Sequence, residues 1–213
     1  MKAPLAPPSD CPLCPRLHAF RHENRQKFPD WFNDPVPSFG PLDALILIAG
    51  LAPGLQGANR TGRPFTGDWA GDLLYATLLK HGLAKGKYDE RADDGLELVG
   101  CRIANAVRCV PPQNKPEPGE IKTCRQFLKS ELEVLPKVTV ILALGKIAHD
   151  SVCDALGARK ALHPFKHGIA YEKLGKFTLI SSYHCSRYNT NTGVLTTKMF
   201  EDVVGKAKTL AGI

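Results

Sequence analysis

The sequence lacks any apolar run long enough to cross a membrane. Its longest apolar runs, residues 44–49 and 138–144, fall far short of the roughly 20 residues that span a bilayer. The N-terminus also lacks the apolar segment of a secretion signal, since prolines and Asp10 occupy that stretch. These absences predict a cytoplasmic protein with no membrane partner.

Internal repeats, low-complexity segments and long polar linkers are also missing. The 213 residues can bury a substantial core, so we expect one domain over residues 1–213, with an N-terminal segment of about residues 1–40 wrapped around it. A monomer is the simplest expectation. Neither G-x-x-x-x-G-K-[ST] nor G-x-G-x-x-G occurs, which disfavours an enzyme that holds phosphate in a glycine-rich loop.

Basic side chains exceed acidic ones, 28 to 21, for a formal net charge of +7. An excess of this size favours an anionic partner such as DNA, although charge alone is weak support for one.

Apolar runs alternate with helical patterns along the chain. Residues 15–28 are compatible with a helix, and residues 84–95 are predicted to be a charged surface loop. Strands are predicted over residues 44–49, 98–107, 138–144 and 177–182, and helices over 68–81, 117–135, 146–156 and 195–210. This alternation predicts an α/β fold with a central four-stranded, mostly parallel sheet flanked by helices on both faces.

Polar and glycine-rich segments follow three of the predicted strands. One runs from Gly50 to Asp68, one begins at Asn105, and one begins at Tyr183. Ligands of open α/β sheets bind outside the carboxyl ends of the strands, so these segments are expected to meet at one site.

Seven cysteines are many for a reducing compartment, where disulfides are rare. Cys11 and Cys14 form a C-x-x-C pair, and Cys109 and Cys124 form a second pair with 14 residues between them. Four cysteines in this pattern suit a four-thiolate metal site, either a [4Fe–4S] cluster or zinc; unrelated buried thiols are the third alternative. The remaining cysteines, Cys101, Cys153 and Cys185, are expected to be free thiols.

The motifs in their order resemble uracil-DNA glycosylases of the iron–sulfur type, closest to the fifth family, type b. The resemblance covers most of the chain and rests on residues 50–54, 57–63, 65–68, 105–109, 124 and 184–193. The related fourth family has Glu at the second position of the first motif, where this chain has Leu51. The chain also departs from the family's usual His-Pro-Ser pattern, because Cys185 stands in place of the proline.

The resemblance implies a role for each motif. Asp68 would position or activate the attacking water, Asn105 would read the base edge, and His184 would stabilise the departing base. The implied base-binding residues are Gly50, Leu51, Ala52, Pro53, Gly54, Phe65, Asn105 and His184. Those implied to enter or hold the DNA are Ser186, Arg187, Tyr188 and Asn189, and those implied to hold a [4Fe–4S] cluster are Cys11, Cys14, Cys109 and Cys124.

Each role has an ordinary structural alternative. Asp68 is also placed to cap the helix that begins after it, Phe65 suits a core position, and Asn105 suits a turn. For Asp68 both interpretations can hold together.

The implied activity is hydrolysis of the N-glycosidic bond of uracil in double-stranded DNA, after base flipping and without strand cleavage. Hypoxanthine and xanthine are implied as further substrates, and the enzyme would associate with the nucleoid when it acts. The principal alternative is a non-catalytic iron–sulfur module that binds DNA.

Overall fold

The computed structural model describes residues 6–213, so the first five residues of the predicted N-terminal segment lie outside it. A five-stranded sheet forms the centre, in the order β4(Cys101–Asn105), β1(Ile46–Gly50), β5(Val140–Leu144), β7(Phe177–Ser182) and β6(Ala170–Leu174). The first four strands are mutually parallel, as the sequence predicted. The fold is therefore the predicted α/β fold with one strand more.

The fifth strand, β6, pairs antiparallel with β7 at the edge of the sheet and shifts register between Tyr171 and Leu174. It is missing from the sequence-based assignment because an edge strand exposed to solvent carries Glu172 and Lys173 and has no continuous apolar run. The predicted surface loop at 84–95 needs a smaller correction, since it begins with β2(Ala84–Lys85), which pairs with β3(Glu97–Leu98).

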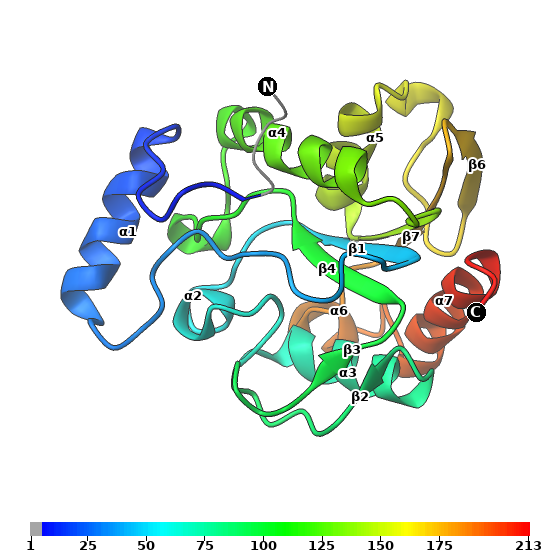
Figure 1. Cartoon of the computed structure of the whole chain (residues 1–213), viewed down its shortest axis with the longest axis horizontal. Helices are drawn as coiled ribbons and strands as arrows, with labels where there is room; N and C mark the ends of the chain where they lie inside the picture. The colour runs from blue at the N-terminus through cyan, green and yellow to red at the C-terminus, as the bar shows by residue number, and fades with distance from the viewer. Residues whose placement is uncertain (1–5) are drawn as a thin grey trace.

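Helices cover both faces of the sheet (Figure 1). The helices are α1(Pro15–Lys27), α2(Ala58–Thr61), α3(Trp69–Lys80), α4(Pro118–Val134), α5(Lys146–Leu156), α6(Arg187–Asn191) and α7(Thr197–Leu210), with 3-10 turns η1(Pro112–Asn114) and η2(Lys160–Leu162). No helix within residues 6–213 is long and apolar enough to span a membrane.

Alternate residues of the central strands supply two separate cores. On β1, Ile46 and Ile48 pack with α3 and α7, whereas Leu47 and Ala49 pack with α4 and α5. Burial on both faces explains why β1 and β5 read as continuous apolar runs.

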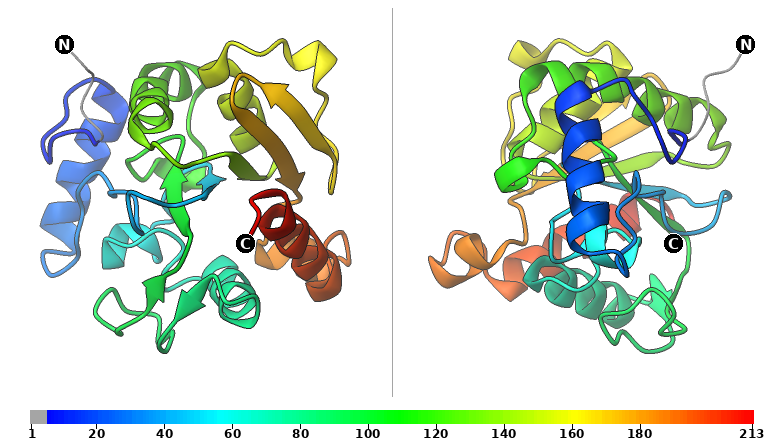
Figure 2. Two further views of the ribbon diagram at one scale, coloured as in Figure 1. Left: turned by 45° about the vertical axis from the view of Figure 1, so that its right-hand side comes forward. Right: turned by 90° about the vertical axis from the view of Figure 1, so that its left-hand side faces the viewer.

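The N-terminal segment lies at one side of the molecule, where α1 faces the viewer in the right-hand view of Figure 2. Leu17 of α1 packs with Val107 and Phe127, and the Arg16 guanidinium donates two hydrogen bonds to the Glu120 carboxylate of α4. These contacts bring Cys14, which precedes α1, into the same cluster as Cys109 and Cys124.

A buried carboxylate fixes the loop that follows β4. Glu131 of α4 is fully buried and accepts hydrogen bonds from Arg108, Arg102 and Ser38. Burial alone would raise the pKa of Glu131, but Arg108 and the other donors lower it overall. The backbone beside Cys109 is thus tied to α4 by a charged pair that excludes water.

Candidate active site

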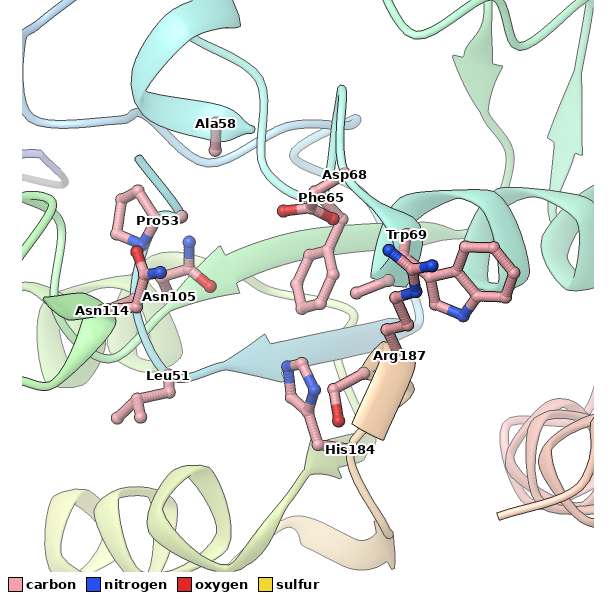
Figure 3. Close-up of a pocket in the computed structure, with 14 residues that line it drawn as sticks. Leu51, Pro53, Ala58, Phe65, Asp68, Trp69, Asn105, Asn114, His184 and Arg187 are labelled. Carbon is pink, nitrogen blue, oxygen red and sulfur yellow. The ribbon is translucent and has the colours of Figure 1, made fainter. Parts of the chain in front are cut away.

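The polar segments predicted to meet do form one pocket, of about 400 Å³, at the carboxyl edge of the parallel strands (Figure 3). Phe65 and Asp68 reach it from the loop between α2 and α3, Asn105 from the end of β4, and His184 from the segment after β7. Leu51, Ala52, Pro53 and Gly54 line it as well.

Two glycines let these side chains converge. A Cβ atom on Gly50 would lie 2.3 Å from Asn105 Oδ1 and 2.8 Å from the ring of Phe65. A Cβ atom on Gly57 would lie 2.4 Å from Asp68 Oδ2. Any larger residue at either position would push the functional side chains out of place.

Phe65 is buried, at 7% exposure, and also lines the pocket, so it is both a core residue and a pocket wall. Its ring and that of His184 lie 6.0 Å apart between centroids, at 29° to each other. The backbone of Phe65 has a φ of +53°, which non-glycine residues rarely adopt. Strain of this kind persists only where the surroundings hold it.

Tyr88 supplies part of that restraint. Its hydroxyl accepts a hydrogen bond from the Gly67 amide at 3.2 Å and lies 3.4 Å from the Phe65 carbonyl oxygen, to which it donates. Tyr88, which does not line the pocket, therefore holds the segment between Phe65 and Asp68 through these two hydrogen bonds.

Asp68 caps α3, as one interpretation of the sequence predicted: its Oδ1 accepts a hydrogen bond from the Gly71 amide at 3.1 Å. The other oxygen, Oδ2, faces the glycine loop, where it lies 3.2 Å from the position of a Cβ on Gly54. One oxygen is thus used by the helix, and the second is directed at the pocket.

The surroundings of His184 favour a neutral imidazole. Burial lowers its pKa below the ordinary value, and the nearby Asp68 carboxylate only partly opposes this. The loop is held by Asn189, whose amide donates to the His184 carbonyl oxygen at 2.8 Å. Cys185, which stands where the resemblance leads one to expect proline, is fully buried, and its thiol donates to the Ala70 carbonyl of α3. The substitution therefore anchors the loop to α3.

Asn105 is the last residue of β4 and is 3% exposed. Its Oδ1 is buried without a hydrogen-bond partner among the described residues. A buried amide oxygen left unpaired is rare and costly, which favours a donor supplied by a ligand.

The sequence did not point to Asn114, which lines the same pocket from η1. Its backbone has a φ of +56°, and its Oδ1 accepts a hydrogen bond from the Leu55 amide at 3.1 Å. The one signal that could have found it is an asparagine placed just after a Pro-Pro turn, behind the strand that carries Asn105.

The residues expected to touch DNA lie at the pocket rim, on and beside α6. Ser186 and Arg187 line the pocket, whereas Tyr188 is 74% exposed. Trp69, to which no sequence motif pointed, joins α6 to the segment of Asp68. Its ring lies 5.6 Å from the Arg187 guanidinium, and its Nε1 donates to Thr190.

The four cysteines predicted to bind a metal gather beside α1, and Cys11, Cys109 and Cys124 are buried. Within residues 6–213, no three of these thiols lie within 4.8 Å of one another. A single tetrahedral zinc with Zn–S bonds of about 2.3 Å would need its sulfurs about 3.8 Å apart. The four thiols therefore do not form the compact arrangement of a single tetrahedral zinc site. The other three cysteines, Cys101, Cys153 and Cys185, are also buried.

The surroundings of Arg21 are a second indication of the group that the four cysteines bind. It is 1% exposed and donates to Cys109 Sγ at 2.9 Å and to the Cys11 carbonyl at 3.1 Å, while its closest carboxylate, Asp10, is 3.9 Å away. A buried cation with so distant a counter-ion is costly. Burial also raises the pKa of Cys14 to about 11 and that of Cys124 to about 12, so the thiols alone do not supply the negative charge. An anionic metal–thiolate group fits this place.

Comparison with known proteins agrees with this geometry. Residues 37–208 match the family model described as "Uracil DNA glycosylase superfamily". A type-5 uracil-DNA glycosylase of Thermus thermophilus is 48% identical over 209 residues, which cover 95% of this chain and 94% of that protein.

More distant relatives follow the same pattern. A type-5 uracil-DNA glycosylase of Pyrobaculum aerophilum is 38% identical, with 95% of this chain and 90% of the relative covered. A type-4 uracil-DNA glycosylase of Thermotoga maritima is 31% identical, with 79% of each chain covered. By the extent of the family match and by these identities, the chain belongs to the uracil-DNA glycosylase superfamily.

Proposed function

We propose that this chain extrudes uracil and other deaminated bases from double-stranded DNA and hydrolyses the N-glycosidic bond, leaving an abasic site. Family membership supports the coarser statement, an enzyme of DNA repair that removes uracil by hydrolysing an N-glycosyl bond. The observation that carries the finer proposal is the convergence of Phe65, Asp68, Asn105 and His184 on one pocket. We also propose that it acts as a cytoplasmic, nucleoid-associated monomer and a single domain.

Extrusion is required because the glycosidic bond of a stacked base cannot be reached. The extruded base stacks on Phe65, a contact of about 1–3 kcal/mol per base in single-strand sites. The Asn105 amide, whose Oδ1 has no partner within residues 6–213, accepts from the N3–H of uracil and donates to a neighbouring carbonyl. Cytosine presents the reverse pattern at N3 and is rejected.

The chemical step divides between two groups. Asp68 Oδ2 orients the attacking water and stabilises the positive charge that develops on the sugar. A hydrogen bond from neutral His184 stabilises the negative charge that develops on the departing base. No lysine lines the pocket within the described part of the chain, which supports direct hydrolysis without a covalent adduct.

On the DNA side, α6 and the preceding Ser186 enter the groove. Arg187 and the exposed Tyr188 fill the gap that the extruded nucleotide leaves, and Asn189 holds the loop in shape. Trp69, which directly follows Asp68 in the chain, connects α6 to Asp68 through its contacts with Arg187 and Thr190.

Tyr88→Phe should lower the excision rate about tenfold, because a few tenths of an ångström at Phe65 and Asp68 matter to a positioned reaction. Binding of an abasic-site product should change little, since Tyr88 lies outside the pocket. Single-turnover rates measure excision, and the affinity for a duplex with an abasic site measures product binding. Tyr171→Phe, which removes a hydroxyl that donates to Pro164 elsewhere, is the matched control. Equal rates in both variants would mean that Tyr88 does not position the loop.

The cysteines support a second part of the proposal, a [4Fe–4S] cluster held by Cys11, Cys14, Cys109 and Cys124. When bound, the cluster supplies a structural link between the N-terminal segment and the loop after β4. The residues of this chain do the rest: Arg21 offsets the charge of the thiolates, and the Arg108 amide donates to Cys124 Sγ at 3.3 Å.

Arg21→Gln should increase the rate of iron loss to a chelator by about tenfold or more, because it removes the buried positive charge beside the thiolates. Iron per protein and the decay of visible absorbance measure this. Lys27→Gln, a change at an exposed lysine in the last turn of the same helix, serves as control. Iron retention that is equal in the two variants would contradict the role of Arg21, and stoichiometric zinc without iron in anaerobically purified protein would contradict the cluster.

The range of damaged bases that the enzyme removes requires a separate experiment. Oligonucleotides with uracil, hypoxanthine, xanthine or normal bases, in duplex and single-stranded form, are incubated with iron-loaded protein, and abasic sites are cleaved with alkali. We expect cleavage at all three lesions in duplexes and none at normal bases. Intact lesion strands would favour the non-catalytic DNA-binding module, and a borohydride-trapped adduct would contradict direct hydrolysis.

A further inference from the structure

A second group of metal-binding side chains lies on the outer side of the N-terminal segment. His18 and His22 are four residues apart on α1, so they share one face of the helix, and Asp10 approaches them from the preceding loop. Within residues 6–213 this is the one set of three His, Cys, Asp or Glu whose ligand atoms all lie within 4.8 Å of one another. The excision pocket does not include these residues.

The three ligand atoms form a nearly equilateral triangle. Nε2 of His22 lies 3.2 Å from Asp10 Oδ1 and 3.2 Å from Nε2 of His18, and the third side, from His18 Nε2 to Asp10 Oδ1, is 3.3 Å. A tetrahedral zinc with bonds of about 2.0–2.1 Å holds its ligands about 3.3–3.4 Å apart. The triangle therefore matches one face of a zinc coordination tetrahedron.

Hydrogen bonds alone do not account for this geometry. If both imidazoles donate to Asp10 through Nε2, their own contact at 3.2 Å brings two hydrogens together. If only one Nε2 carries a hydrogen, one of the three contacts joins two acceptors or relies on a shared hydrogen. A cation at the centre makes all three contacts favourable at once.

We propose that Asp10, His18 and His22 bind a divalent transition metal, Zn²⁺ as the first candidate, with water in the fourth position. Two imidazoles and a carboxylate suit zinc better than magnesium or calcium, which prefer oxygen ligands. The side chains are partly exposed, at 33% for His18, 47% for His22 and 66% for Asp10, so the ion can enter from solvent.

Two guanidinium groups lie near the Asp10 carboxylate, and both have closer partners. Arg25 is 3.4 Å from Oδ1 but forms its shortest ion pair with Asp34, and Arg21 is 3.9 Å away and donates to Cys109. They reduce the affinity for a cation without occupying the ligand triangle. The bound metal would clamp the loop that carries Cys11 onto α1.

The test uses iron-loaded protein, with zinc bound per chain measured by equilibrium dialysis and iron measured on the same samples. We expect one zinc for the wild type. His22→Asn and Asp10→Asn each remove a direct ligand, so they should weaken zinc binding by at least the roughly 10–100-fold that loss of an outer partner costs a metal site. His163→Asn, which removes an imidazole elsewhere, should leave binding unchanged.

Zinc X-ray absorption of the wild type gives a reading that does not depend on variants. Imidazole and oxygen ligands without sulfur support the site. Sulfur ligation, absence of zinc binding by iron-loaded protein, or equal binding by wild type and His22→Asn would overturn it. Iron content reports the cluster separately, so failure of the cluster proposal is distinguishable from failure of this one.

Discussion

Asp68→Asn should lower the single-turnover rate of uracil excision by about 10²–10⁴-fold, the range that a positioned acid–base group contributes. Asparagine keeps an Oδ1 that can accept from the Gly71 amide, and it caps helices as well as aspartate does. The substitution therefore removes the charge of the pocket-facing oxygen while leaving α3 intact, and thermal unfolding should change little.

The matched control is Asp72→Asn, an exposed carboxylate in the first turn of the same helix. It should leave the rate unchanged. Asp68→Ala adds the loss of the cap, about 1 kcal/mol of stability, to the catalytic defect. An Asp68→Asn enzyme with the wild-type rate would show that Asp68 only orders the loop.

His184→Ala should lower the rate by about 10²–10³-fold, the cost of removing one hydrogen-bond donor from a developing anion. The affinity for a duplex that contains an abasic site should fall less, because the contact strengthens only as charge develops on the base. Rates and product affinities measured together test this. A loss of affinity as large as the loss of rate would assign His184 to binding alone. His163→Ala, which removes an imidazole outside the pocket, is the control.

The charge state of His184 can be followed directly. Since burial lowers its pKa, the imidazole should stay neutral as the pH falls through 6.5 and gain its proton only at lower pH. A histidine-selective NMR titration measures the midpoint. A midpoint at or above 6.5 would contradict the lowered pKa, and a midpoint above the pH of the assay would mean that the leaving group meets a charged ring, contrary to the mechanism proposed above.

The sequence predicts best those features that show as a regular pattern of apolar residues within a single strand or helix. β1 and β5 are buried on both faces and give unbroken apolar runs, and the carboxyl ends of parallel strands necessarily share one edge. The order of strands and loops along the chain was therefore enough to bring the polar segments to one edge, and the family resemblance singled out Phe65, Asp68, Asn105 and His184 within them.

What the sequence could not predict depends on contacts between distant segments. Asn114 reaches the pocket through an unusual turn at η1, and Trp69 meets Arg187 only because α3 and α6 lie side by side. The burial of Arg21 likewise follows from the gathering of cysteines that lie far apart in the chain. The edge strand β6 has too weak a pattern to identify alone.

An extruded uracil should occupy the pocket between Phe65 and His184. The most direct measurement is a crystal structure of the iron-loaded protein with a duplex containing 2′-fluoro-2′-deoxyuridine, whose glycosidic bond resists cleavage. We expect the uracil ring to lie on the face of Phe65, with its edge hydrogen-bonded to Asn105 and His184 and a water beside Asp68 Oδ2. A uracil that stays stacked in the duplex, or that binds away from these four residues, would contradict it.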